Sequence, residues 1–348
     1  MSLVSVIMPT FNKAQYLELT LTGFTLQTYT DFEIILVDDG STDHTRQVAE
    51  SFSANMNVKY IYQDNAGRSN ARNRALDNAN GEILVFNDDD RIPAPEFLQA
   101  HVDRLGTGEK LLSVGNKSEI ITFISEKLDL AWDNFLRNFM IRHPELLAKN
   151  LEETQVQICQ AEELAADFWT AMGQVLYRKG SDHYGEVVNQ YGYDLDEFLF
   201  GWAICTTGNL AVRCPSEEQA IRFDESYTGW GMEDTDYAYQ FVLQGYRVVC
   251  CEQAHNFHQV HPRSLQQTTE LAANLKRFSR KYSKEPDATT EEPTVMMALY
   301  IRFLANRYTL PELNQIALEL QDVKPSTFVL DYLKLVRQQA SALLRSWS

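Results

Sequence analysis

Residues 32–40 read FEIILVDDG, an apolar run that ends in two aspartates and a glycine. A largely apolar run of this length, interrupted only by Glu33 and closed by a turn signal, is typical of a strand that is buried on both faces. The same pattern occurs earlier at Leu3–Met8 and later at Val58–Tyr62 and Glu82–Phe86. These four stretches are therefore predicted to be strands of one buried sheet.

Segments with helical spacing or capping residues separate the four predicted strands, at residues 12–28, 41–52 and 69–79. Strands that alternate with helices predict a mostly parallel sheet with helices on both faces, which is a doubly wound, Rossmann-like α/β domain. Ligands bind such domains beyond the carboxyl ends of the strands. Polar clusters follow all four strands at that end, at residues 9–12, 38–40, 64–67 and 88–90. One shared site is therefore expected at this edge of the sheet.

The composition narrows the class of protein. The chain has 348 residues, 44% of them apolar, which is enough for one large α/β domain with an appendage or for two domains. Its net charge of −17 argues against a nucleic-acid binder, because such proteins present a basic face. The cysteines form no Cys-x-x-Cys pair, which favours a reduced compartment. Neither a signal-peptide pattern nor a run of about 18 apolar residues occurs. We expect a cytoplasmic protein without a transmembrane segment; the inner face of the membrane is a compatible location.

Beyond residue 115 the pattern changes, and a helical and loop insertion is expected at 116–199. Residues 180–201 are rich in Tyr, Gly and Asp and are interpreted as a loop or lid. Further regular elements are expected at 210–212, 234–243 and 247–251. The polar stretch 283–293 is the best candidate for a linker. The predicted organisation is a catalytic domain at 1–264, which includes the insertion, and a helical region at 265–348.

The sharpest chemical feature is the run Asp88-Asp89-Asp90 at the end of the fourth predicted strand. Three adjacent carboxylates repel one another, and a divalent cation among them makes the clustering favourable. Mg²⁺ or Mn²⁺ held by one or two carboxylates and by phosphate oxygens would also activate a diphosphate leaving group. A solvated acidic turn before Pro93 explains the same run about equally well.

A second feature is the sequence GWGMED at residues 229–234. Glycines allow a ligand to approach the backbone closely, and the indole face of Trp230 suits the apolar face of a sugar. Either Glu233 or Asp234 can act as a general base on a hydroxyl. For the two carboxylates alone, a helix start where they complement the dipole is the favoured interpretation. Both interpretations hold together, because a helix start fixes its side chains.

The remaining clusters are basic: His255, His258 and His261, and Arg68, Arg72 and Arg74. The histidine spacing can place two imidazoles near one ion, although unrelated histidines in a loop fit it as well. The arginines stand out in so acidic a chain and can bind phosphate or the carboxylates of a metal site. Ordinary helix-surface charge explains Arg74 better than Arg68 or Arg72.

Taken in order, these motifs resemble those of the family 2 glycosyltransferases, which have the GT-A fold. The resemblance rests on VSVIMPTFNKAQYL, FEIILVDDGSTD, NAGRSNARNRAL and GEILVFNDDDRIPAPEFL, and on the later TTGNLAV and FDESYTGWGMEDTDYAYQFVLQGYRV. The later motifs are closest to the galactosyl- and N-acetylgalactosaminyltransferase branch. The resemblance covers residues 3–115 and 200–265.

The resemblance implies roles for the residues at the strand ends. Asp234 would be the general base, and Glu233 would position the acceptor or the sugar. Phe11 would lie beside the nucleotide base, Asp39 would hydrogen-bond the edge of the base, and Arg72 would approach the diphosphate or the base. Together, the residues that contact the nucleotide or substrate would be Pro9, Thr10, Phe11, Asn12, Asp38, Asp39, Asn65, Gly67, Arg72, Asp88, Asp89 and Trp230.

The resemblance also implies a metal, Mn²⁺ or Mg²⁺. Asp88 and Asp90 would be the two ends of a DxD motif, with Asp90 the direct ligand, and His258 would be the remote ligand with His261 as its competitor. A histidine ligand favours Mn²⁺, because imidazole suits softer ions. The family often reads Leu-Asp-x-Asp where this chain has Asn87 and three aspartates, so the pair of carboxylates that binds metal stays open.

The predicted activity is that of an inverting hexosyltransferase in polysaccharide biosynthesis. It would move Gal or GalNAc from a UDP-sugar to a hydroxyl of a saccharide or lipid-linked saccharide. Two alternatives are a nucleotidyltransferase, whose Gly-rich signature residues Pro9–Lys13 lack, and a non-catalytic nucleotide-sugar-binding protein. No nucleic-acid partner is expected, and the sequence leaves the oligomeric state open.

Overall fold

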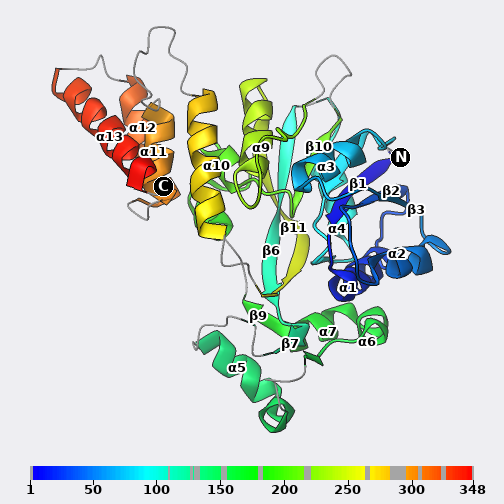
Figure 1. The fold of residues 1–348 in the computed structure, drawn as a ribbon. Helices are drawn as coiled ribbons and strands as arrows, with labels where there is room; N and C mark the ends of the chain where they lie inside the picture. Colours follow the sequence, from blue (N-terminus) through cyan, green and yellow to red (C-terminus); the bar gives the residue numbers. More distant parts are fainter. Residues whose placement is uncertain are drawn as a thin grey trace.

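The computed structural model describes residues 3–108, 110–125, 128, 134–149, 155–178, 183–214, 221–262, 267–282, 295–304, 308–322 and 327–346. Its centre is a nine-stranded sheet in the order β3-β2-β1-β4-β10-β6-β11-β5, with β9 paired to β6. Helices cover this sheet (Figure 1). The predicted α/β fold class, a mostly parallel sheet with helices, is confirmed.

The first four strands form the parallel half of the sheet, as predicted. β1 (Val4–Thr10) lies between β2 (Phe32–Asp38) and β4 (Ile83–Phe86), and β3 (Val58–Tyr62) pairs with β2. In register, Thr10 lies opposite Asp38, and Asp38 lies opposite Tyr62. The carboxyl ends of these strands therefore meet at one edge. The connecting helices are α1 (Ala14–Thr25), α2 (Thr45–Ser53) and α3 (Arg68–Leu76).

The other half of the sheet is mixed. β10 (Leu210–Arg213) runs antiparallel between β4 and β6 (Leu111–Ile120), and β6 runs parallel to β11 (Arg247–Gln259). The short β5 (Arg91–Pro93) pairs antiparallel with the far end of β11. The remaining helices of this half are α4 (Phe97–Leu105) and α9 (Glu233–Leu243).

Two expectations for this half were wrong. The insertion was expected to start at residue 116, but residues 116–120 continue β6. The last strand was expected to end at Cys251, but β11 extends to Gln259, so His255 and His258 lie in a strand rather than in a loop. The reason is a register shift between Cys251 and Asn256, which lets a polar segment rejoin the ladder with β6.

The rest of the insertion forms a small lobe at the lower end of the molecule in Figure 1. A two-stranded sheet of β7 (Phe123–Ile124) and β8 (Val156–Gln157) lies there. Its other elements are α5 (Asn134–Arg142), a 3₁₀ turn (Pro144–Ala148), α6 (Ala161–Ala166), α7 (Phe168–Val175) and β9 (Leu176–Arg178).

Residues 180–201 are not a loop or lid in their described part. They contain α8 (Tyr184–Tyr191), and the following turns lead into a 3₁₀ turn at Gly201–Ile204. Val187, Leu195 and Phe198 are buried in the main hydrophobic core. The sequence pattern did not predict the burial of these residues, because polar residues separate them. The segment packs through scattered side chains rather than along one periodic face.

The C-terminal region is helical, as expected: α10 (Gln267–Tyr282), α11 (Val295–Leu304), α12 (Leu310–Asp322) and α13 (Thr327–Ser346). Its core is continuous with that of the sheet. The rings of Phe278 and Tyr300 lie 5.9 and 4.6 Å from that of Trp202. The expected linker at 283–293 lies outside the described residues. None of the helices that the structure describes is long and apolar enough to span a membrane.

Candidate active site

A cluster of potential metal ligands lies at the edge of the sheet. Asp90 follows β4, and β5 places it beside the end of β11, where Arg91 lies opposite His258 in the ladder. The Asp90 Oδ2 atom is 2.9 Å from His261 Nε2, and its Oδ1 atom is 3.9 Å from His258 Nε2. One ligand atom from each of these three residues lies within 4.8 Å of the other two. This spacing fits a single ion.

The charges around this cluster also fit a cation. Although burial opposes its ionisation, Lys13 and the hydrogen bond from His261 hold the pKa of Asp90 well below its usual range. Burial, aided by Arg91, lowers the pKa of His258 to about 3, so its imidazole is neutral. A neutral imidazole and an ionised carboxylate are the forms that bind metal. Lys13 donates to Asp90 Oδ2 at 3.0 Å, a contact that the sequence did not suggest.

The three consecutive aspartates have different surroundings. Asp88 faces two arginines, with Arg72 Nη2 at 3.1 Å and Arg91 Nε at 3.7 Å. Asp89 is buried, and burial together with the nearby Asp90 charge raises its pKa to about 7. The ligand cluster among the described residues thus includes Asp90 and both histidines. The role of Asp88 as a second metal ligand stays a prediction.

Asn87 fixes the turn that carries these carboxylates. Its side-chain amide donates to the carbonyls of Asp88 and Arg91, at 2.9 and 2.8 Å. Its own oxygen accepts from Asn256 Nδ2 at 2.8 Å. Because Asn256 lies in β11 two residues before His258, this pair joins the aspartate turn to the strand of the histidines. The only hint of this role in the sequence was that Asn87 stands where the family often has leucine.

Arg72 joins the aspartate turn to the start of α9. It lies in α3, and its guanidinium is 3.1 Å from Asp88 Oδ1 and 3.4 Å from Glu233 Oε1. Arg68, one turn earlier, lies 3.5 Å from the same Glu233 oxygen. The predicted phosphate-binding arginines therefore occupy the space between the aspartates and the GWGMED segment.

The predicted general base, Asp234, lies in the first turn of α9, which begins at Glu233 as expected. Burial and the neighbouring Glu233 raise the pKa of Asp234 to about 6, while Arg72 opposes the rise. A carboxylate with a pKa near 6 accepts a proton more readily than an ordinary aspartate and is still ionised at pH 7. Trp230, which precedes Asp234 by four residues, is 39% exposed.

The loops after β1, β2 and β3 are tied to one another. Asp39 accepts hydrogen bonds from Gln63 Nε2 and from the backbone of Ala66 and Gly67, and Asn65 Nδ2 donates to its carbonyl. The expected contact of Asp39 with a base edge therefore stays a prediction. The other predicted nucleotide contacts lie at the same edge: Pro9 and Thr10 at the end of β1, Phe11 (47% exposed), Asn12, whose backbone donates to Ser41, and Asp38, which accepts from Tyr60.

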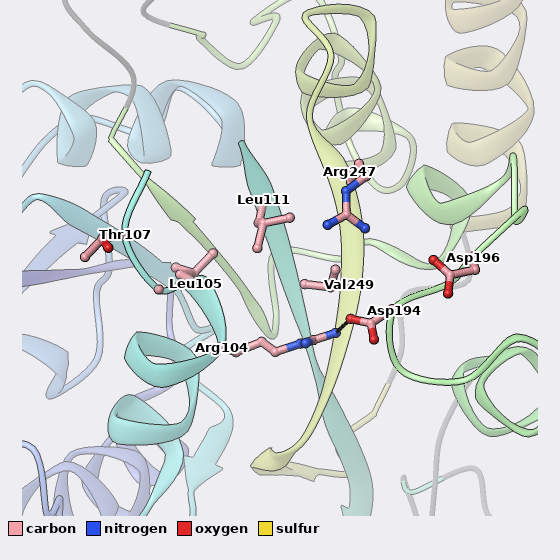
Figure 2. A pocket seen from close by; sticks show the side chains of 9 residues that line it. Arg104, Leu105, Thr107, Leu111, Asp194, Asp196, Arg247 and Val249 are labelled. Atoms are coloured by element: carbon pink, nitrogen blue, oxygen red, sulfur yellow. Dashed lines mark hydrogen bonds and ion pairs between the residues drawn. The ribbon is translucent and has the colours of Figure 1, made fainter. Parts of the chain in front are cut away.

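A cavity of about 440 Å³ lies elsewhere, at the opposite end of β6 and β11 (Figure 2). Arg104 reaches across it to Asp194, with 2.7 Å between Nη2 and Oδ1. None of the described residues lining it is a predicted site residue. Val249 lines this cavity and lies opposite Ser113 of β6, whereas His258 lies opposite Glu119, which is roughly 20 Å further along β6 at about 3.3 Å per residue.

This strand order, with carboxylates, histidines and arginines gathered at the strand ends, agrees with the GT-A fold that the sequence motifs predict, and solved glycosyltransferases share the fold. Residues 5–154 match the model of the family described as glycosyl transferase family 2. The match covers less than half of the chain, so the similarity to this family is shown for residues 5–154.

Curated relatives extend this likeness beyond residue 154. The chain is 27% identical to an uncharacterized glycosyltransferase, YfnE, of Bacillus subtilis, covering 80% of this chain and 70% of that protein. It is 25% identical to chondroitin synthase of Escherichia coli, over 86% of this chain and 42% of the synthase. It is 27% identical to validoxylamine A glucosyltransferase of Streptomyces hygroscopicus, over 80% of this chain and 61% of the glucosyltransferase. The chain thus spans less than two thirds of the latter two.

Two solved structures share the fold at low sequence identity. One is S. aureus TarS 1–349 in complex with UDP-GlcNAc, with a TM-score of 0.53, 15% identity, and coverage of 88% of this chain and 72% of that one. The other is the mannosyltransferase PcManGT of Pyrobaculum calidifontis in complex with GDP-Man and Mn²⁺, with a TM-score of 0.53, 18% identity, and coverage of 100% and 86%.

Proposed function

We propose that this chain is an inverting, metal-dependent glycosyltransferase that uses a nucleotide-sugar donor. The observation that carries the proposal is the continuity of the site. A metal-ligand cluster, a pair of arginines and a carboxylate with a raised pKa follow one another along a single sheet edge. The match of residues 5–154 to the family 2 model and the glycosyltransferase names of the relatives support the same activity.

Asp90, His258 and His261 would hold the divalent ion. Their spacing and protonation fit one, and two nitrogen ligands favour Mn²⁺ over Mg²⁺. The ion would supply positive charge to the diphosphate of the donor. Lys13 and Arg72 add fixed cations on the protein side, so part of this charge stabilisation comes from the chain itself.

Asp234 performs the proton transfer. It takes the proton of an acceptor hydroxyl, the oxygen forms a bond to the anomeric carbon, and the bond from that carbon to the diphosphate breaks. The diphosphate leaves with its electron pair from the opposite face, so the configuration inverts. Arg72 holds Glu233 beside the base, and Trp230 offers an indole face to a sugar ring. Holding both substrates in this geometry supplies much of the rate enhancement.

For the donor we propose UDP-galactose or UDP-N-acetylgalactosamine, and for the acceptor a saccharide or lipid-linked saccharide on the cytoplasmic side. Support comes from the GWGMED segment and from the similarity to chondroitin synthase. The solved neighbours carry UDP-GlcNAc and GDP-Man, so these donors belong in the same test.

The test is a donor screen. The chain is incubated with Mn²⁺ and each of UDP-Gal, UDP-GalNAc, UDP-GlcNAc, UDP-Glc and GDP-Man, and released nucleoside diphosphate is measured. We expect release from a UDP-sugar, loss of release with EDTA, and at least a hundredfold slower release by Asp234→Asn. Binding without release would favour a non-catalytic protein. Pyrophosphate production from UTP and a sugar 1-phosphate would favour a nucleotidyltransferase.

A further inference from the structure

The loop Thr228–Met232, which precedes the predicted base, has an unusual backbone. Gly229, Gly231 and Met232 all have positive φ angles, of 73°, 95° and 73°. Glycine adopts this region freely, but for a methionine it costs on the order of 1–3 kcal/mol. A loop in such a conformation keeps its shape only when its surroundings determine it. Both this loop and the helix that contacts it lie beyond the residues that match the family 2 model, 5–154.

Helix α10 supplies these contacts through Asn274 and Glu270. The Asn274 side chain is 1% exposed, and its Nδ2 atom lies 2.9 Å from the carbonyls of Thr228 and Gly231 and 3.3 Å from that of Trp230. One turn earlier, Glu270 Oε2 accepts a hydrogen bond of 2.9 Å from the Trp230 backbone. The carbonyls and an N–H of one loop are thus satisfied by two side chains on one face of α10.

The packing is as close as the hydrogen bonding. A methyl group on Gly229 would lie 2.5 Å from Glu270 Cδ, and one on Gly231 would lie 2.8 Å from Leu271 Cδ1. Real side chains almost never approach so closely, so the two glycines let the loop backbone lie directly against α10. Gly229 and Gly231 thus suit the packing against α10 as well as the approach of a ligand.

The other end of α10 is fixed to the same region. Lys281 pairs with Asp224 at 2.8 Å and with the fully buried Asp236 at 2.9 Å. Tyr282 donates to Asp236 at 2.8 Å. Asp224 precedes the loop Thr228–Met232, and Asp236 follows it in the first turn of α9. Helix α10 is therefore bound to the chain on both sides of the loop and cannot shift independently of it.

We propose that Asn274 and Glu270 are positioning residues, which hold the loop Thr228–Met232 so that Trp230 and Asp234 face the acceptor. This inference rests on the proposed function and gives α10 a role in the reaction. Neither residue takes part in bond making. They act by fixing the position of the base, and a displacement of about 1 Å at a reacting group can cost about a hundredfold in rate.

The chain contains a matched control. Asn314 in α12 is also a fully buried asparagine that binds a loop, accepting from Leu199 N at 2.7 Å and donating to the Glu197 carbonyl at 2.8 Å. This loop follows Asp194 and Asp196, which line the cavity of Figure 2 and not the candidate site. Asn314→Ala therefore tests what the loss of a buried amide does to stability alone.

The experiment compares Asn274→Ala with Asn314→Ala. Both should lower the melting temperature. Only Asn274→Ala should lower the kcat of donor hydrolysis, by roughly 10- to 100-fold, while the Kd for UDP with Mn²⁺ changes less than twofold. Equal kcat values for the two variants, each measured well below its melting temperature, would overturn the proposal.

A second pair of variants covers the case in which Asn274→Ala fails to fold. Glu270→Ala removes the acceptor for the Trp230 N–H, whereas Glu270→Gln keeps an oxygen there. We expect the first to lose activity and the second to retain it. Amide hydrogen exchange at residues 229–232 should be faster in Glu270→Ala and unchanged in Asn314→Ala, whether or not a donor is turned over. A wild type that releases no nucleotide would refute the proposed function, and unaltered exchange in Glu270→Ala would refute the positioning role.

Discussion

Replacing Arg72 with methionine removes the cation that joins Asp88 to Glu233. The Arg72 and Glu233 side chains are 5% and 4% exposed, so the variant leaves a buried carboxylate without its partner. Breaking a buried pair in this way costs about 3–5 kcal/mol. Arg68 already lies 3.5 Å from Glu233 and compensates in part. We therefore expect the lower end of this range, about 3 kcal/mol.

This loss is large enough to measure by calorimetry. An unfolding entropy of about 2.1 cal/mol/K per residue gives about 730 cal/mol/K for 348 residues, so about 3 kcal/mol lowers Tm by about 4 °C. Arg72→Lys keeps the positive charge, so its Tm should fall less than that of Arg72→Met.

The pH dependence of Tm gives a second test. Arg72 opposes the rise in the pKa of Asp234, so methionine should raise that pKa further. Protonation of Asp234 below pH 6 removes a charge that faces the arginine, so the Tm difference should narrow from pH 8 to pH 5. An unchanged Tm at pH 8, or a difference that widens on acidification, would refute this reasoning.

Three further predictions concern the base and the metal ligands. Turnover should rise with pH through about 6, because Asp234 works only when deprotonated, and a flat profile from pH 5 to 8 would contradict its assignment. Asn87→Leu should weaken Mn²⁺ binding by about tenfold or more in the absence of donor, since it frees the turn that carries Asp90. His258→Ala and His261→Ala should each weaken Mn²⁺ binding more than Asn87→Leu does, as measured by the electron paramagnetic resonance of free Mn²⁺; a histidine variant with wild-type affinity is not a ligand.

The parallel half of the fold and the sheet edge at which the candidate site residues gather were predictable from local pattern. Four apolar runs that end in polar clusters specify both, since the carboxyl ends of parallel strands must meet. The start of α9 at Glu233 was predictable for the same reason, because acidic residues favour the first turn of a helix.

Contacts between distant segments were not predictable. The length of β11 depends on pairing with β6 after a register shift, so nothing local marks His258 as a strand residue. Asn274 bonds a loop more than forty residues earlier, and no spacing in α10 reveals it. The burial of Val187 and Phe198 likewise depends on helices that follow much later in the chain.

The central claim is that the aspartate turn, His258 near the end of β11 and His261 just beyond it together form a metal-dependent nucleotide site. Isothermal titration of UDP in the presence of Mn²⁺ tests it most directly. The wild type should bind UDP, and binding should be lost on adding EDTA or in Asp90→Ala. Equal UDP affinity in the wild type and in Asp90→Ala, with and without Mn²⁺, would contradict the claim.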